Sequence, residues 1–273
     1  MLSYRKLAMR VLGRPLHTGG GIDSPRPASQ RAAAFILTAA MLTTFTAPAF
    51  AKTWYIENGD ITISAGKTEG TNKVSQGSTT DEEDTDTVIT NNNRDTASSH
   101  TVTIDAKDKD DKVEVTLKDV NIDASSRSEA AVSVTGKGDT TIELDGDNEL
   151  KSGAGHAGLE HNKTDTSGEL TIQDKDKNGS LEAAGGFKGA GIGSAGSNDA
   201  QVKITGGNIT ATSDDWGAGI GSGSEKGCSN IVIESGTITA KGGDLGAGIG
   251  GGQLAAGQNI TIRDGNVTAI PGR

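Results

Sequence analysis

The residues best suited to bind a cation lie in one short acidic segment. Residues 174–179 read Asp-Lys-Asp-Lys-Asn-Gly, which is the opening of a calcium loop, where alternate oxygen ligands surround the ion and glycine permits the bend. The twelfth position is Gly185 in place of the bidentate glutamate. The candidate calcium ligands are Asp174, Asp176, Asn178 and Glu182. The alternative is a solvated turn between two strands, because Asp, Asn and Gly are ordinary turn formers.

A tryptophan beside two carboxylates is the candidate carbohydrate site. Asp214, Asp215 and Trp216 are consecutive, and sugars are bound on exposed aromatic faces, which are large, rigid and amphipathic. The corresponding segment of the next repeat, residues 242–245, reads Gly-Gly-Asp-Leu, which is typical of a plain turn. Two other interpretations therefore stay open, namely an ordinary turn and an indole ring that wedges over the core.

No catalytic constellation is recognisable beyond residue 51. A polysaccharide lyase needs a calcium-held uronate and a strong base such as arginine, and a hydrolase needs two carboxylates at a defined separation. The histidines and arginines of this part of the chain are scattered along it: His100, His156, His161, Arg94, Arg127, Arg263 and Arg273. The sequence therefore predicts a protein that is not an enzyme, with a polysaccharide lyase as an alternative.

The beginning of the chain is typical of a secretory signal. Residues 1–31 carry six basic residues and one acidic residue, and an apolar run follows at residues 32–45. That run is shorter than the ~20 residues of a membrane span, and Ala49 and Ala51 supply the small side chains of a cleavage site. We expect residues 1–51 to be removed, which leaves a secreted or cell-surface protein with no membrane segment.

The composition of the remainder limits its function and its means of stabilisation. Residues 52–273 hold 20 basic and 35 acidic residues, a net charge of −15, which argues against nucleic-acid binding because that function needs clustered Lys and Arg. Cys228 is the single cysteine, so no disulfide framework is expected. The aromatic residues are few: Trp54, Tyr55, Phe187 and Trp216. Backbone pairing and stacked aliphatic residues must provide the stability, with Trp54 and Tyr55 covering the first coil.

A repeat of 28 to 29 residues dominates the second half of the chain. The segment Gly-Ala-Gly-Ile-Gly occurs at residues 189–193, 217–221 and 246–250. Two short alternating runs follow each copy, and alternation is typical of strands, whose successive side chains face opposite sides. The aliphatic positions recur every 29 residues, as Ile204, Ile233 and Ile262 in the first run and as Ile209, Ile238 and Val267 in the second.

This repeat predicts an all-β fold, a single-stranded parallel β-helix (β-solenoid) of about seven or eight coils. Equivalent strands of successive coils pair in parallel about 4.8 Å apart, so residues one repeat apart lie over one another. The alanine and isoleucine of the glycine-rich segment are expected inside, while its glycines allow close approach of neighbouring coils. We expect a cap with an irregular acidic loop over residues 52–100, and the β-helix over residues 101–273 with regular repeats from about residue 153.

The glycine-rich repeats, together with residues 116–120, 144–150 and 155–159, resemble secreted bacterial repeat proteins described as carbohydrate-binding-domain-containing. Those proteins are pectate-lyase-like right-handed β-helices. The resemblance therefore implies a right-handed β-helix and, by analogy of fold, glycan binding. The chain shows no terminal sorting motif of the kind that attaches such proteins to a cell wall.

These observations predict an exported, non-catalytic glycan-binding protein, assisted by calcium if the acidic loop binds it. An adhesin-like stalk that acts through its stacked surface is the structural alternative. The last alternating run ends four residues before Arg273, and Pro271 is the one residue that blocks its edge. We expect this C-terminal edge to be poorly protected, as in a truncated protein, an end that self-associates or an end that binds a partner.

Overall fold

The computed structural model describes residues 51–196, 198–225 and 227–273. The predicted secretory segment, apart from Ala51, lies outside these residues. The described residues belong to one compact unit, which consists of strands and one short 3-10 helix, η1 (Ile56–Asn58). No helix in this part of the chain is long and apolar enough to cross a membrane.

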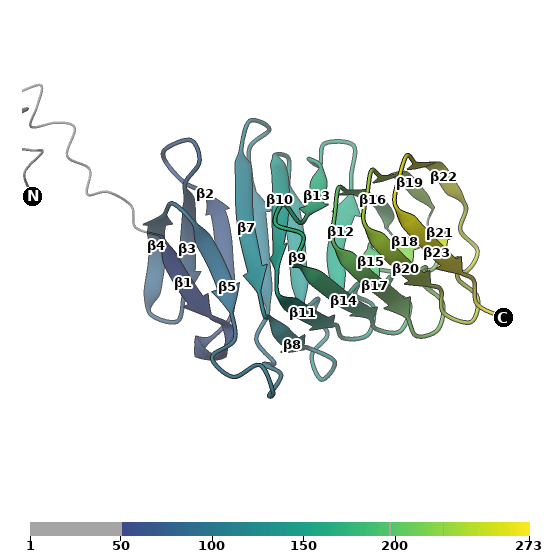
Figure 1. Cartoon of the computed structure of the whole chain (residues 1–273), viewed down its shortest axis with the longest axis horizontal. Helices are drawn as coiled ribbons and strands as arrows, with labels where there is room; N and C mark the ends of the chain where they lie inside the picture. The colour runs from purple at the N-terminus through teal and green to yellow at the C-terminus, as the bar shows by residue number, and fades with distance from the viewer. Residues whose placement is uncertain (1–50, 197, 226) are drawn as a thin grey trace, which may run out of the picture. The chain divides into compact units, whose positions relative to one another are not determined.

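Three stacks of parallel strands, called sheets A, B and C, form the unit (Figure 1). Sheet A contains β1 (Lys52–Tyr55), β5 (Thr87–Thr90), β7 (Lys112–Lys118), β10 (Asp139–Asp145), β13 (Leu170–Gln173), β16 (Asp199–Ile204), β19 (Cys228–Ile233) and β22 (Gly257–Ile262). Sheet B contains β2 (Ile61–Ala65), β6 (Val102–Ala106), β9 (Val132–Gly136), β12 (Leu159–Lys163), β15 (Ile192–Gly193), β18 (Ile220–Gly221) and β21 (Ile249–Gly250). Sheet C contains β8 (Asn121–Asp123), β11 (Asp147–Lys151), β14 (Ser180–Gly185), β17 (Asn208–Ser213), β20 (Thr237–Lys241) and β23 (Asn266–Ile270).

The chain passes from a strand of sheet A to sheet C, then to sheet B, and returns to sheet A one turn further on. This path is that of a parallel β-helix, so the predicted all-β fold is confirmed. Sheet C has six strands, which makes about six regular turns, slightly fewer than the seven or eight predicted. In the two N-terminal turns no strand of sheet C is formed, and the chain runs there through η1 and through Ser98, which forms one isolated bridge with Ile122.

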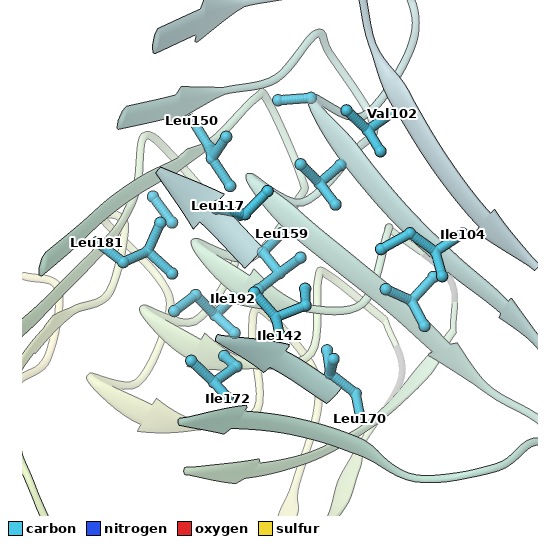
Figure 2. Packing of buried hydrophobic residues seen from close by; sticks show 14 of the residues in the cluster. Val102, Ile104, Leu117, Ile142, Leu150, Leu159, Leu170, Ile172, Leu181 and Ile192 are labelled. Atoms are coloured by element: carbon cyan, nitrogen blue, oxygen red, sulfur yellow. The ribbon is translucent and has the colours of Figure 1, made fainter. Parts of the chain in front are cut away.

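Aliphatic side chains stack in columns inside the β-helix. Ile204 pairs with Ile233, and Ile233 with Ile262, across sheet A, in the register that the 29-residue spacing predicts. The second alternating run forms a similar column in sheet C. Figure 2 shows this packing in earlier turns, where Ile142 and Ile172 lie in the interior. β-Branched side chains suit such a pleated surface, and the inward-facing residues of these turns are almost wholly buried.

The Gly-Ala-Gly-Ile-Gly segments form the entry into sheet B. Their alanines and isoleucines face inward as predicted, and Ala218 and Ile220 are buried. Gly221 has a φ of +139°, and a Cβ atom there would lie 1.9 Å from the carbonyl oxygen of Gly250 in the next turn. Glycine is therefore required, because a side chain would collide with the backbone and would hold a φ that L-residues rarely adopt.

Residues 52–100 hold more regular structure than the predicted cap and acidic loop. The acidic run at residues 81–84 is a strand and not a loop, because it lies in β4 (Thr79–Asp84), which forms an antiparallel hairpin with β3 (Asn72–Gln76) and through it extends sheet B. Asp84 anchors this hairpin, since its carboxylate accepts hydrogen bonds from Trp54 Nε1 at 2.7 Å and from Lys52 N at 3.1 Å. Trp54 is only 2% exposed.

Candidate functional site

The turns that lead from sheet C to sheet B stack along one edge of the β-helix. Three of them connect β14 to β15, β17 to β18 and β20 to β21. Backbone hydrogen bonds join neighbouring turns, as where Gly243 N donates to Gly217 O at 3.1 Å. Side chains at equivalent positions of these turns therefore lie on adjacent rungs of one edge.

Two aromatic rings from successive turns meet on this edge. The ring centroids of Phe187 and Trp216 are 4.8 Å apart, with an interplanar angle of 53°. Phe187 is 42% exposed and Trp216 is half-buried. The next turn presents Leu245, which is also exposed. We call Phe187, Lys188 and Trp216 the aromatic turn patch.

Lys188 supplies the positive charge of the aromatic turn patch. Its Nζ lies 5.0 Å from the ring centroid of Trp216 and 5.8 Å from that of Phe187, within the range of a cation–π interaction. The same atom lies 3.4 Å from Glu225 Oε1. Lys188 and Glu225 have φ angles of 70° and 74°, a left-handed conformation that non-glycine residues hold only where their surroundings fix it.

Backbone hydrogen bonds hold the aromatic turn patch in place. Ser224 N donates to Lys188 O at 3.1 Å, and Gln253 N donates to Trp216 O at 2.7 Å. Both carbonyls of the patch thus accept bonds from the segment that follows the next strand of sheet B. A site fixed in this way loses little conformational freedom when a ligand binds.

The two predicted carboxylates lie in the turn that carries Trp216. Asp214 is exposed and Asp215 is half-buried, and Asp215 O accepts a hydrogen bond from Leu245 N at 3.2 Å. The segment is indeed a turn, and Trp216 packs against Phe187 at the surface and does not wedge over the core.

Phe187 was not predicted as part of the site, although the sequence holds a signal that identifies it. It precedes Trp216 by 29 residues, the spacing at which residues of adjacent turns lie side by side in this fold. The two aromatic residues are therefore neighbours by the same arithmetic that aligns the isoleucines.

The predicted calcium loop forms a turn whose side chains contact other partners. Asp174 Oδ1 accepts a hydrogen bond from Asn178 N at 3.1 Å, and Asn178 Nδ2 donates to Asp145 Oδ1 at 3.2 Å. Glu182 is an exposed residue of β14. In the part of the chain that the structure describes, no group of three or more His, Cys, Asp or Glu residues is arranged to hold a metal ion.

A buried carboxylate organises the turn before β12. Glu160 Oε2 lies 2.8 Å from His156 Nδ1 and accepts a bond from Ala157 N at 3.1 Å, while its Oε1 accepts from Asn162 Nδ2 at 2.8 Å. The hydrogen bond with Glu160 raises the pKa of His156, against the opposing effect of partial burial. These contacts all lie within residues 156–162, so they give the group a structural role in shaping the turn.

A polar groove lies over sheet A beside the β3–β4 hairpin. Its lining includes Asn72, Asp86, Glu114, Asp139 and Glu169. Threonines of β7, β10 and β13 complete the wall, so that the groove has no aromatic side chain among its lining residues. It differs in this respect from the aromatic turn patch.

The comparisons with known proteins bear on the fold. The model of a family described as "Beta helix repeat" matches residues 202–224 and 231–253. These two segments cover β17 to β18 and β19 to β21 with the turns that follow, and thus include Trp216. Neither the curated proteins nor the solved structures gave a match. The chain is therefore similar, in its most regular turns, to β-helix repeat proteins.

Proposed function

We propose that the protein is an exported, non-catalytic glycan-binding protein, and that the aromatic turn patch is its binding site. The observation that carries the proposal is the contact of Phe187 with Trp216 at 4.8 Å on an exposed edge. Export rests on the basic and apolar pattern of residues 1–51.

The chemistry of the patch suits a sugar ring. The apolar face of a pyranose packs on aromatic carbons, which are rigid and lose little entropy on binding. Asp214 and Asp215 offer acceptors for hydroxyl groups on the same turn. Lys188 lies above the rings and favours a sugar that carries a carboxylate or another anion.

The proposal is tested with residues 52–273 on a glycan array, followed by calorimetry with the best ligand. Trp216→Ala and Phe187→Ala should each weaken binding by about tenfold or more, because each removes an aromatic face that contacts the ligand. Tyr55→Ala is the matched control, since Tyr55 is 40% exposed but lies in β1.

Two outcomes would redirect the proposal. Binding that survives both patch substitutions would locate the ligand elsewhere, with the polar groove over sheet A as the next site to mutate. No binding to any glycan would contradict the proposal outright. A chelator arm tests the predicted calcium ligands, because loss of binding with chelator that Asp174→Asn reproduces would assign the ion to that loop. An assay for unsaturated uronate products tests the lyase alternative.

A further inference from the structure

The last turn of the β-helix exposes side chains that every earlier turn buries. Ile262 is 50% exposed, whereas Ile233, directly beneath it in the same column, is fully buried. Ile260 is 38% exposed above the buried Ile231. Ile270 in β23 is exposed as well. The end of the β-helix is therefore an apolar surface made of the same residue types as the interior.

The backbone of this turn is also open on one side. In the described chain β22 pairs with β19 and β23 pairs with β20, and neither has a partner on its outer side. Unpaired N–H and C=O groups on a strand edge are a template for another strand. The surface thus offers hydrogen bonds together with apolar contacts.

The other end of the β-helix is covered. The hairpin of β3 and β4 extends sheet B beyond the first turn in antiparallel pairing. Trp54 is buried there by its bond to Asp84, and Lys52 Nζ pairs with Glu82 Oε2 at 2.8 Å. Because this end is closed by the chain's own residues, an open tail cannot extend the β-helix by stacking on the head of another copy.

Charge favours contact between two tails. Residues 254–273 carry Arg263, Asp264 and Arg273, a net charge of +1, whereas residues 52–253 carry 18 basic and 34 acidic residues, a net charge of −16. Two copies that meet through their last turns bring together their least acidic parts and keep the acidic parts apart. Repulsion between like charges therefore opposes this arrangement less than any other end-to-end contact.

We propose that the last turn is a self-association surface, on which a second copy of this chain packs tail to tail about a two-fold axis. The edge strands β22 of the two copies run antiparallel, because a two-fold axis reverses strand direction, and Ile260 and Ile262 of one copy pack against the same residues of the other. Such an interface is self-complementary and closes at two copies.

Light scattering coupled to size exclusion, with residues 52–273 loaded over roughly two decades of micromolar concentration, tests the proposal. The expected result is a dimer that dissociates on dilution. Ile262→Lys should shift the dissociation constant upward by at least about a hundredfold, because two lysines would face each other across an apolar contact. Since Ile262 is already half exposed in the monomer, circular dichroism should show an unchanged fold.

Tyr55→Lys is the matched control, because it places the same charge on an exposed ring near the covered end. It should leave the dimer intact, and so should Trp216→Ala, so that failure of glycan binding and failure of dimerisation are separate results. A second measurement is hydrogen exchange, in which the amides of β22 should become protected as concentration rises. A monomer throughout the range, or an open series of oligomers that Tyr55→Lys interrupts, would overturn the proposal.

Discussion

At the scale of single residues, His161 is a titratable group placed in the interior. It lies in sheet B over Val134, which in turn lies over Ile104, and it is 2% exposed. Its Nδ1 donates to the carbonyl oxygen of Gln201 at 2.8 Å. Burial lowers the pKa of the ring, although the hydrogen bond to Gln201 opposes that effect. The folded protein therefore favours the neutral imidazole.

This burial predicts a loss of stability in mild acid. The unfolded chain takes up a proton on His161 below its ordinary pKa of 6.5, while the folded chain resists, so the free energy of unfolding falls as pH drops from 6.5 toward the lowered pKa and is constant above 6.5 for this group. Each unit of difference in pKa corresponds to about 1.4 kcal/mol. Urea denaturation of the protein and of His161→Val between pH 5 and pH 8 measures this slope.

The substitution His161→Val serves as its own test because the pH profiles are compared and not the absolute stabilities. His156, whose raised pKa acts with the opposite sign above pH 6.5, is present in both proteins and cancels. Parallel pH profiles of the two proteins would show that His161 has no part in the acid sensitivity.

The candidate site was only partly readable from residues alone. Trp216 and its two carboxylates stand out because they are adjacent in sequence, and Phe187 is found once the 29-residue period is applied to aromatic residues. The calcium pattern of residues 174–179 gives no such view of its surroundings. The partner of Asn178 is Asp145, in the previous turn, and a local pattern does not contain that contact.

At the scale of elements, the close approach of backbones between turns makes single glycines decisive. Gly221→Ala should lower the free energy of unfolding by about 2 kcal/mol or more, because the new Cβ meets the Gly250 carbonyl at 1.9 Å and the φ of +139° is strained for alanine. The matched control is Gly196→Ala, whose Cβ would lie 3.7 Å from that of Lys188. It should change stability by less than about 0.5 kcal/mol. Equal effects in urea denaturation would contradict this account.

The strands of the regular turns could be predicted because periodicity and alternation agree there. Ile233 and Ile262 carry both signals, and the structure pairs them as expected. The strand β4 carries neither, because its sequence Thr-Thr-Asp-Glu-Glu-Asp is polar throughout. It is held by contacts that charged side chains make with distant partners, such as Asp84 with Trp54.

At the scale of the whole molecule, the negative charge is unevenly distributed along the β-helix. Residues 52–169 hold 12 basic and 25 acidic residues, whereas residues 170–273 hold 8 and 10. The acidic half also contains the irregular turns and the β3–β4 hairpin. Repulsion is therefore concentrated in the part of the molecule whose turns repeat least regularly.

Raising the salt concentration should stabilise this protein. Between about 10 and 150 mM NaCl the Debye length falls from roughly 30 to 8 Å, so repulsion among distant carboxylates is screened. The exposed ion pairs lose little, because such pairs are worth about 0–1 kcal/mol. We expect a rise of a few degrees in Tm by calorimetry, with KCl as the control for ion-specific effects. An unchanged or lower Tm in both salts would argue that self-repulsion is negligible.

The ladder of glycine-rich rungs also sets how the protein should respond to pulling. Each turn contacts only the turns beside it, so tension applied through Arg273 would peel β23 and β22 away before any other strand yields. Each detached rung of about 29 residues would release roughly 100 Å of slack. A force–extension trace should therefore be a sawtooth of evenly spaced steps that begins at the tail, as in a spool that unwinds one loop at a time.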